Sequence, residues 1–190
     1  YEKYRYCVLD SNGQVHSTLG EWPYRDKDEK TVSGIVRSQA YMFGIASSPS
    51  RTKFVAYLMS ADMLSFYQLE NDSLHLRKET IVTYPDYEYR NNPTDYSGAS
   101  RDSPLVYLWG TCSEDYVYLL YSGKKFRQNA LASFSGDMIY VYNWNGDKIA
   151  MIKSDKMLKQ ICVAKDGKTM YAIACDLDPV LVHFPLPQWE

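Results

Sequence analysis

The acidic residues that could take part in a reaction stand in short loop pairs. Asp86 and Glu88 flank Tyr87, and Asp176 and Asp178 flank Leu177. Two neighbouring carboxylates can bind calcium through their oxygens, or they can act as acid and base in glycoside hydrolysis. Acidic pairs in polar loops more often face solvent as turn residues. These pairs therefore suggest a reaction to test, but they do not form a catalytic signature.

Histidines and cysteines do not form the clusters that metal or nucleophilic sites need. His16, His75 and His183 lie in separate segments without paired spacing, and the four cysteines contain no C-x-x-C pair. The chain also lacks the G-x-S-x-G sequence of a nucleophile elbow and a glycine-rich phosphate loop. We therefore predict no metal site and no cofactor, and we favour a binding protein over an enzyme.

Aromatic and arginine residues gather in the three longest polar segments, which are Gly20–Ser38, Thr83–Pro104 and Ser122–Gly136. An aromatic ring offers a flat apolar surface and arginine offers a planar fork of donors, a combination that suits sugars, peptides or another protein. Long loops on a rigid scaffold are also where binding residues concentrate. The alternative is that these loops only cover neighbouring strands. The candidate ligand-binding residues are Trp22, Arg25, Tyr87, Tyr89, Arg90, Arg101, Phe126 and Arg127.

Composition narrows the class of protein. The chain has 190 residues, a net charge of −2 and 45% hydrophobic residues. It lacks the clustered basic excess of a nucleic-acid-binding protein and is too apolar for a disordered chain. No apolar run approaches the roughly 18 residues of a membrane span. Tyrosine is unusually frequent, at 18 residues, and tyrosine favours strands.

Alternating strands separated by polar turns recur along the chain and predict an all-β fold. A strand–turn–strand pattern begins near Ser48, Cys112 and Ala164, and each is followed by a further strand and turn. The repeat of roughly 50 residues is typical of a β-propeller, whose blades are four-stranded antiparallel sheets. A β-sandwich would also give many short strands, but it would not explain a recurrent four-strand unit.

The repeat divides the chain into about three and a half blades. Residues 1–19 end one blade, 39–82 and 105–154 form two blades, and 159–190 form a last blade that lacks its outer strand. We therefore expect a single domain that is the C-terminal part of a six-bladed propeller. Its missing N-terminal blades, or a second chain, would complete it. In this topology the long loops and Asp176–Pro179 lie on one face.

Several of these segments resemble one known family. Ser113–Leu120, Ile139–Asp147 and Met170–Ile173, with the hairpin sequence Val8–Gly13, are similar to the TolB-like six-bladed propeller family of Bacteroidales. Members of that family typically begin with a secretion or lipoprotein signal and are mostly uncharacterised. The resemblance implies export to the periplasm or cell surface, with a lipid anchor as one form of attachment. It carries no catalytic residues.

These observations favour an exported, non-enzymatic module that binds a protein, peptide or glycan through its loop-rich face. The alternative is a carbohydrate-active hydrolase or lyase that uses the loop carboxylates, and a third interpretation is a scaffold completed by a partner chain. Nucleic acid is not an expected partner.

Overall fold

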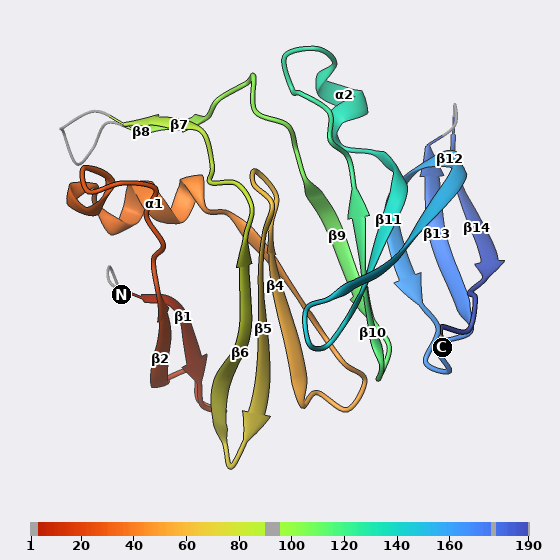
Figure 1. The fold of residues 1–190 in the computed structure, drawn as a ribbon, viewed down its shortest axis with the longest axis horizontal. Coiled ribbons are helices and arrows are strands. Elements are labelled where there is room, and N and C mark those ends of the chain that lie inside the picture. The colour runs from red at the N-terminus through yellow and green to blue at the C-terminus, as the bar shows by residue number, and fades with distance from the viewer. Residues whose placement is uncertain (1–3, 90–95, 176–177, 190) are drawn as a thin grey trace.

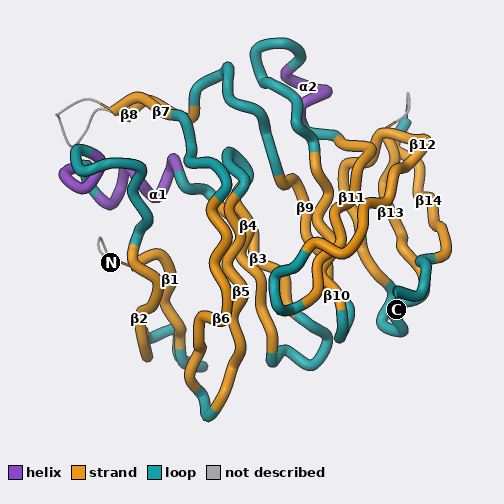
Figure 2. The backbone as a smooth tube through the Cα atoms, viewed as in Figure 1, coloured by secondary structure: helices purple, strands orange, loops and turns teal. Residues whose placement is uncertain are grey.

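Most of the chain forms antiparallel strands, as the alternating pattern predicted. The structure is a computed structural model that describes residues 4–89, 96–175 and 178–189 (Figures 1 and 2). The first large sheet has four strands in chain order, which are β3 (Phe43–Ser47), β4 (Lys53–Leu58), β5 (Met63–Glu70) and β6 (Ser73–Ile81).

The second large sheet has six strands because one long strand joins two groups of antiparallel strands. Its strands are β9 (Tyr107–Cys112), β10 (Tyr116–Tyr121), β11 (Gly136–Asn143), β12 (Lys148–Val163), β13 (Thr169–Cys175) and β14 (Pro179–Pro185). The sequence predicted that one blade ends at residue 154 and the next begins at residue 159, but the strand β12 runs through this boundary. Residues 148–153 pair with β11 and residues 158–163 pair mainly with β13. The intervening residues 154–157 contain no glycine or proline that would turn the chain, so the extended backbone continues from one group into the next.

The groups of antiparallel strands are arranged radially. The first strands of successive groups lie side by side, since β3 contacts β9 and β9 contacts β12. Neighbouring groups also pack face to face through apolar cores, in one of which Val55 and Phe66 cluster with Leu119. This is the arrangement of a partial β-propeller, which confirms the predicted fold class.

A two-stranded hairpin of β1 (Tyr4–Leu9) and β2 (Val15–Glu21) packs beside the first large sheet. Its turn contains Asn12-Gly13, and Gly13 has a φ of 77° that favours glycine. Arg5 of β1 joins the hairpin to β6 through an ion pair with Glu79 at 2.8 Å. The buried guanidinium also donates to Ser65 of β5, so the hairpin is fixed against the sheet.

One predicted strand starts later than the sequence indicated. The blade predicted over residues 39–82 should open on a strand, but Ala40 ends the helix α1 (Gly34–Ala40), and the strand begins at Phe43. The Ser33 hydroxyl caps this helix by accepting from the Val36 amide. Val32, Val36 and Ala40 are spaced at four-residue intervals and pack into one core, so burial of this face favours a helix.

The remaining elements are short and lie in the long loops. They are the 3₁₀ helix η1 (Glu29–Thr31), the hairpin strands β7 (Tyr87–Tyr89) and β8 (Tyr96–Ala99), and the helix α2 (Ala130–Ser133).

Buried tyrosines join neighbouring groups of strands. The Tyr57 hydroxyl of β4 accepts from the Gly110 amide of β9 at 2.9 Å. The Tyr57 ring lies against Gly44 and Gly110, where an added Cβ would come within 2.3 and 2.5 Å of ring atoms. The fully buried Tyr107 donates to Asp62 at 2.7 Å, with the Tyr142 hydroxyl 2.9 Å away. These hydroxyls are buried with their hydrogen bonds made, so they help to fix one group of strands against the next.

Stability should fall at alkaline pH because these tyrosines are buried as neutral groups. Burial raises the pKa of Tyr107 and Tyr57, and it raises the pKa of Tyr142 to about 12. Tyrosines of the unfolded chain ionise near pH 10, so the unfolded state then binds fewer protons than the folded state. The free energy of unfolding should be insensitive to tyrosine ionisation below about pH 9 and should fall above about pH 10.

Urea titrations at successive pH values would measure this fall. Each buried tyrosine contributes a slope of up to about 1.4 kcal/mol per pH unit. Tyr142→Phe should therefore show a shallower decline than the unaltered chain. An unfolding free energy that stays level through pH 11 would contradict the assignment.

Candidate functional site

The long loops lie together at one edge of the strands. In Figure 1, α1, the β7–β8 hairpin and α2 all stand at the upper side of the molecule, while the turns β1–β2, β5–β6 and β9–β10 lie at the lower side. The loop-rich face is therefore defined by residues 20–42, 83–89, 96–106 and 122–135. The strands beneath it provide a rigid base.

Two of these loops are joined to each other by backbone hydrogen bonds. The Leu105 amide donates to the Lys124 carbonyl at 3.0 Å, and the Gly123 amide donates to the Leu105 carbonyl at 2.8 Å. Further along, the Arg127 amide donates to the Arg101 carbonyl at 2.9 Å. Three predicted site residues, Arg101, Phe126 and Arg127, are thus brought into one region although they come from different loops.

A cavity of about 250 Å³, which we name the Arg101–Phe126 cavity, lies between these loops. Its lining is mostly apolar or hydroxylic and contains no carboxylate among the described residues. The Phe126 ring continues this surface because it packs edge to face against Phe134, with the two ring centroids 6.1 Å apart. The cavity could hold an amino-acid side chain or part of a sugar ring, with the Arg101 guanidinium as a donor. It is lined by Ser60, Ser100, Arg101, Ser103, Pro104, Leu105 and Phe126.

Trp22 and Tyr87 lie below the surface and support the face. Trp22 is 6% exposed and Tyr87 is 3% exposed, and both rings contact Tyr41 edge to face. The fully buried Glu29 accepts from the Tyr41 hydroxyl at 3.0 Å and from the Tyr87 hydroxyl at 2.5 Å. The amide of Arg25 also donates to this carboxylate, while the Arg25 side chain is exposed and pairs with Asp26.

Glu29 links two of the long loops, its own and the one that carries Tyr87, and sequence reasoning did not find it. Burial, followed by the nearby Glu29 carboxylate, raises the pKa of Tyr41, so the hydroxyl remains a donor. In the sequence Glu29 stands in a run of charged residues from Arg25 to Lys30, which is typical of a solvated loop. The apolar residues on either side, Trp22 and Val32, were the available signal that this run crosses a core.

Among the predicted residues whose side chains the structure describes, only Arg101 and Phe126 line the cavity. Tyr89 pairs with Tyr96 in the β7–β8 hairpin, and Arg90 lies outside the described residues. Asp86 and Glu88 are exposed and do not belong to the lining of the Arg101–Phe126 cavity. Asp178 is exposed, and Asp176 lies outside the described residues. Within the described part of the chain no group of three or more His, Cys, Asp or Glu side chains could hold a metal ion.

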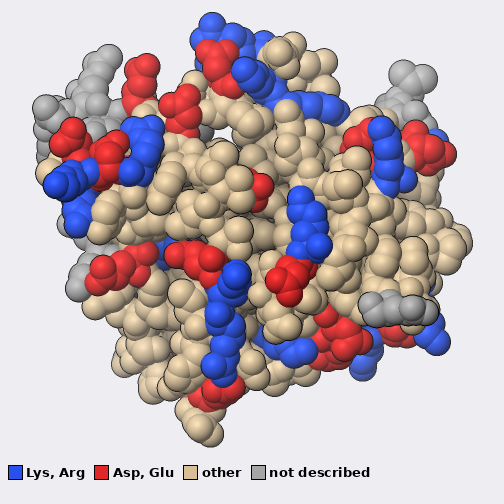
Figure 3. Space-filling model, in the orientation of Figure 1, with Lys and Arg blue, Asp and Glu red and all other residues tan. Residues whose placement is uncertain are grey.

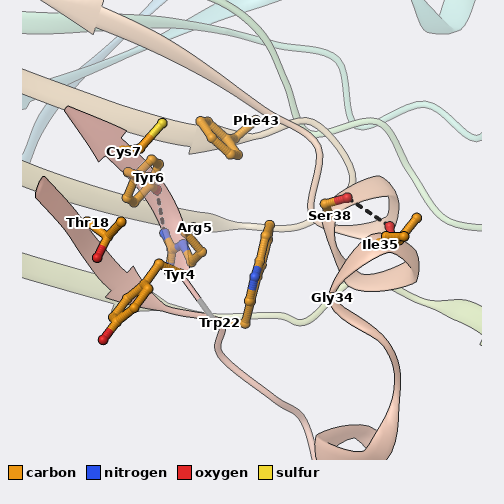
Figure 4. A pocket seen from close by; sticks show the side chains of 10 residues that line it. All are labelled: Tyr4, Arg5, Tyr6, Cys7, Thr18, Trp22, Gly34, Ile35, Ser38 and Phe43. Atoms are coloured by element: carbon orange, nitrogen blue, oxygen red, sulfur yellow. Dashed lines mark hydrogen bonds between the residues drawn. The ribbon is translucent and has the colours of Figure 1, made fainter. Parts of the chain in front are cut away.

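A second hollow of about 310 Å³ lies between the β1–β2 hairpin and α1 (Figure 4). The Trp22 indole stands between Arg5 on the hairpin side and Gly34 at the start of α1, and Phe43 lies beyond Tyr6. Arg5 is already hydrogen-bonded to Tyr6 and Ser65. Aromatic rings form part of its lining, and sequence reasoning did not identify the hollow because its walls come from β1, β2, α1, β3 and the loop that carries Trp22.

Comparison with known proteins identifies a family. The family model described as TolB-like 6-blade propeller-like matches residues 1–166, in agreement with the resemblance noted from the sequence. Comparison with curated protein sequences finds no match. Within the described residues, no helix is long and apolar enough to cross a membrane.

Solved structures with a similar backbone include other proteins of low sequence identity. The β-propeller domain of Cps50 (Swd1) from Myceliophteria thermophila is 9% identical, with a TM-score of 0.40 over 75% of this chain and 38% of the other. A protein from Lactobacillus plantarum is 12% identical, with a TM-score of 0.39 over 74% of this chain and 40% of the other. The chain thus spans less than half the length of these two structures.

Loss of the Glu29 carboxylate should destabilise the loop-rich face. In Glu29→Ala the hydroxyls of Tyr41 and Tyr87 would lose their acceptor, and the free energy of unfolding should fall by about 3 kcal/mol. Glu29→Gln keeps an acceptor oxygen and should cost less. Urea denaturation followed by circular dichroism measures both, with the exposed Lys27→Ala as the matched control. Equal stability of Glu29→Ala and the Lys27 control would contradict this role.

Proposed function

Because the chain belongs to the TolB-like 6-blade propeller-like family, we propose that it acts as a non-enzymatic binding module. A propeller in general is suited to binding, since rigid sheets hold the loops of one face in place. The partner we propose is a protein, a peptide or a glycan, captured on the loop-rich face. The family also supports a proposal that the protein works in the periplasm or at the cell surface, where a lipid would anchor it.

The observation that carries this proposal is the joining of two of the long loops around a cavity. Leu105, Gly123 and Arg127 make backbone hydrogen bonds from one loop to the other, so the cavity keeps its shape before a ligand arrives. Pre-organisation reduces the entropy lost on binding. The exposed guanidinium of Arg101 and the half-buried ring of Phe126 supply the polar and apolar contacts that such a site needs.

Capture by peptide and glycan arrays would test the proposal. The unaltered chain should retain a ligand, and the double variant Arg101→Ala with Phe126→Ala should weaken retention at least about tenfold because it removes a donor and an aromatic wall. Lys165→Ala provides the matched control, since Lys165 is an exposed cation in the turn between β12 and β13 at the opposite edge.

Two results would count against this function. Retention that survives the double variant but is lost in the Lys165 control would place the ligand on the opposite edge. Turnover of an arrayed glycan that disappears in Glu88→Gln would favour the hydrolase or lyase alternative instead.

A further inference from the structure

The loop at the centre of the proposed binding face carries only positive charge. Residues 122–136 contain Lys124, Lys125 and Arg127 and no acidic residue, although the whole chain has a net charge of −2. Arg101 of the neighbouring loop adds a further cation beside the cavity. Figure 3 shows Lys and Arg side chains gathered over α2 and the loop next to it, with acidic atoms among them. The charge of this region is therefore opposite in sign to that of the molecule as a whole.

The fold uses one of these cations and leaves the others available. The Lys124 ammonium donates to the Ser135 carbonyl at 3.3 Å and so holds its own loop closed. Arg127 pairs with Asp102 at 3.0 Å, but the two side chains are 67% and 55% exposed, and such pairs contribute little to stability. Within the described residues, neither Arg101 nor Lys125 has an ion-pair partner.

Apolar side chains are presented beside these cations. Leu131 on α2 is 88% exposed, and Phe134 is 47% exposed next to Phe126. The turn that carries them is fixed, because the Asn129 side chain accepts from the Ala132 amide at 3.0 Å and the Ser122 hydroxyl donates to the Ser133 carbonyl at 2.7 Å. Exposed leucine and phenylalanine on a fixed turn, bordered by cations, are typical of a protein interaction site.

We infer that this surface binds an acidic polypeptide segment that carries an apolar side chain. The surface consists of Arg101, Lys125, Phe126, Arg127, Leu131 and Phe134, and we name it the Leu131 surface. Carboxylates of the segment face Arg101 and Lys125, and its apolar side chains cover Leu131 and Phe134 or enter the Arg101–Phe126 cavity. This inference rests on the proposed function, because it specifies the partner for the same face.

The combination of charge and apolar area selects a polypeptide over other polyanions. A sulfated polysaccharide would satisfy the cations but would leave Leu131 and Phe134 without an apolar partner. An uncharged peptide would cover the apolar residues but would leave the cations unpaired at the rim. Acidic side chains alternating with leucine or phenylalanine supply both contacts, and their charge would also speed the encounter at low salt.

The experiment uses labelled synthetic peptides and fluorescence anisotropy with the full chain. The probe is a pool of peptides rich in aspartate and glutamate with leucine or phenylalanine at varied positions. Comparison pools replace the apolar residues with alanine or the acids with lysine, and a heparin fragment serves as the polyanion control. We expect binding of the first pool alone, weakened at least about tenfold between about 50 mM and about 500 mM salt because screening shortens the reach of the cations.

Variants then assign binding to the surface. Lys125→Glu and Leu131→Ser should each weaken the selected peptide about tenfold or more, since one reverses a charge and the other removes apolar area. Both residues are exposed, so neither substitution disturbs the core. Lys165→Glu at the opposite edge is the matched charge control and should leave affinity unchanged within about twofold.

Several results would overturn the inference. These are binding of heparin that is insensitive to Leu131→Ser, binding of the peptide pool that is insensitive to both variants, and failure of every acidic peptide to bind. The proposed function is judged separately. If the array ligand still depends on Arg101 and Phe126 while all acidic peptides fail, the loop-rich face binds something else and only the acidic-partner inference is lost.

Discussion

A tyrosine hydroxyl buried between two sheets needs a hydrogen-bond partner, and this requirement fixes how the sheets sit against each other. Tyr57 reaches from β4 to the Gly110 amide of β9, and the absence of a side chain at Gly44 and Gly110 leaves room for its ring. Tyr107 of β9 reaches back to Asp62 between β4 and β5. The apolar contacts around these rings would tolerate small shifts, whereas an unpaired buried hydroxyl would be costly. The tyrosines therefore add orientation to a core that is otherwise held by nondirectional burial.

The same contacts determine where the long loops begin. The carbonyl of Asp62 accepts from the amides of Val82 and Thr83, at the point where β6 gives way to the loop. The loop ends where the Val106 amide donates to the Met59 carbonyl, one residue before Tyr107. Both ends of this segment are thus tied to the region that Tyr107 joins between sheets. The hydrogen bonds to residues 123–127 then join the second loop to the first, and the loop-rich face becomes a continuation of the sheet packing.

Local patterns predicted much of the fold because strand alternation and turn chemistry act over a few residues. The dipeptides Asn12-Gly13 and Asn145-Gly146 are typical of hairpin turns, and both glycines take the positive φ that these turns require. The strand–turn–strand pattern that begins near Cys112 likewise forms β9 and β10. The helix α1 was missed because it has only seven residues, too few for a clear helical pattern, and its stability comes from burial of Val36 and Ala40 in a core.

The candidate site was less accessible to sequence reasoning, since it depends on distant segments meeting. Loop composition drew attention to Arg101, Phe126 and Arg127, which the structure brings into one region, but the cavity beside Arg101 and Phe126 follows from hydrogen bonds that no local pattern encodes. Trp22 and Tyr87 carry the residue types of a binding site, yet the structure buries both against Tyr41. Aromatic side chains stabilise both cores and binding sites because their large apolar rings gain from leaving water. Residue type alone therefore does not separate the two roles.

The central claim is that the two long loops and the sheets form one rigid unit, and amide hydrogen exchange tests it most directly. The amides of Leu105, Gly123 and Arg127 each donate across the gap between the loops. If the loops and sheets form one unit, these three amides should exchange as slowly as the amides inside β9 and β10. Their exchange should become fast only under conditions in which the sheets themselves open. Fast exchange at all three positions, with slow exchange retained in the strands, would show that the loops move independently and would contradict the claim.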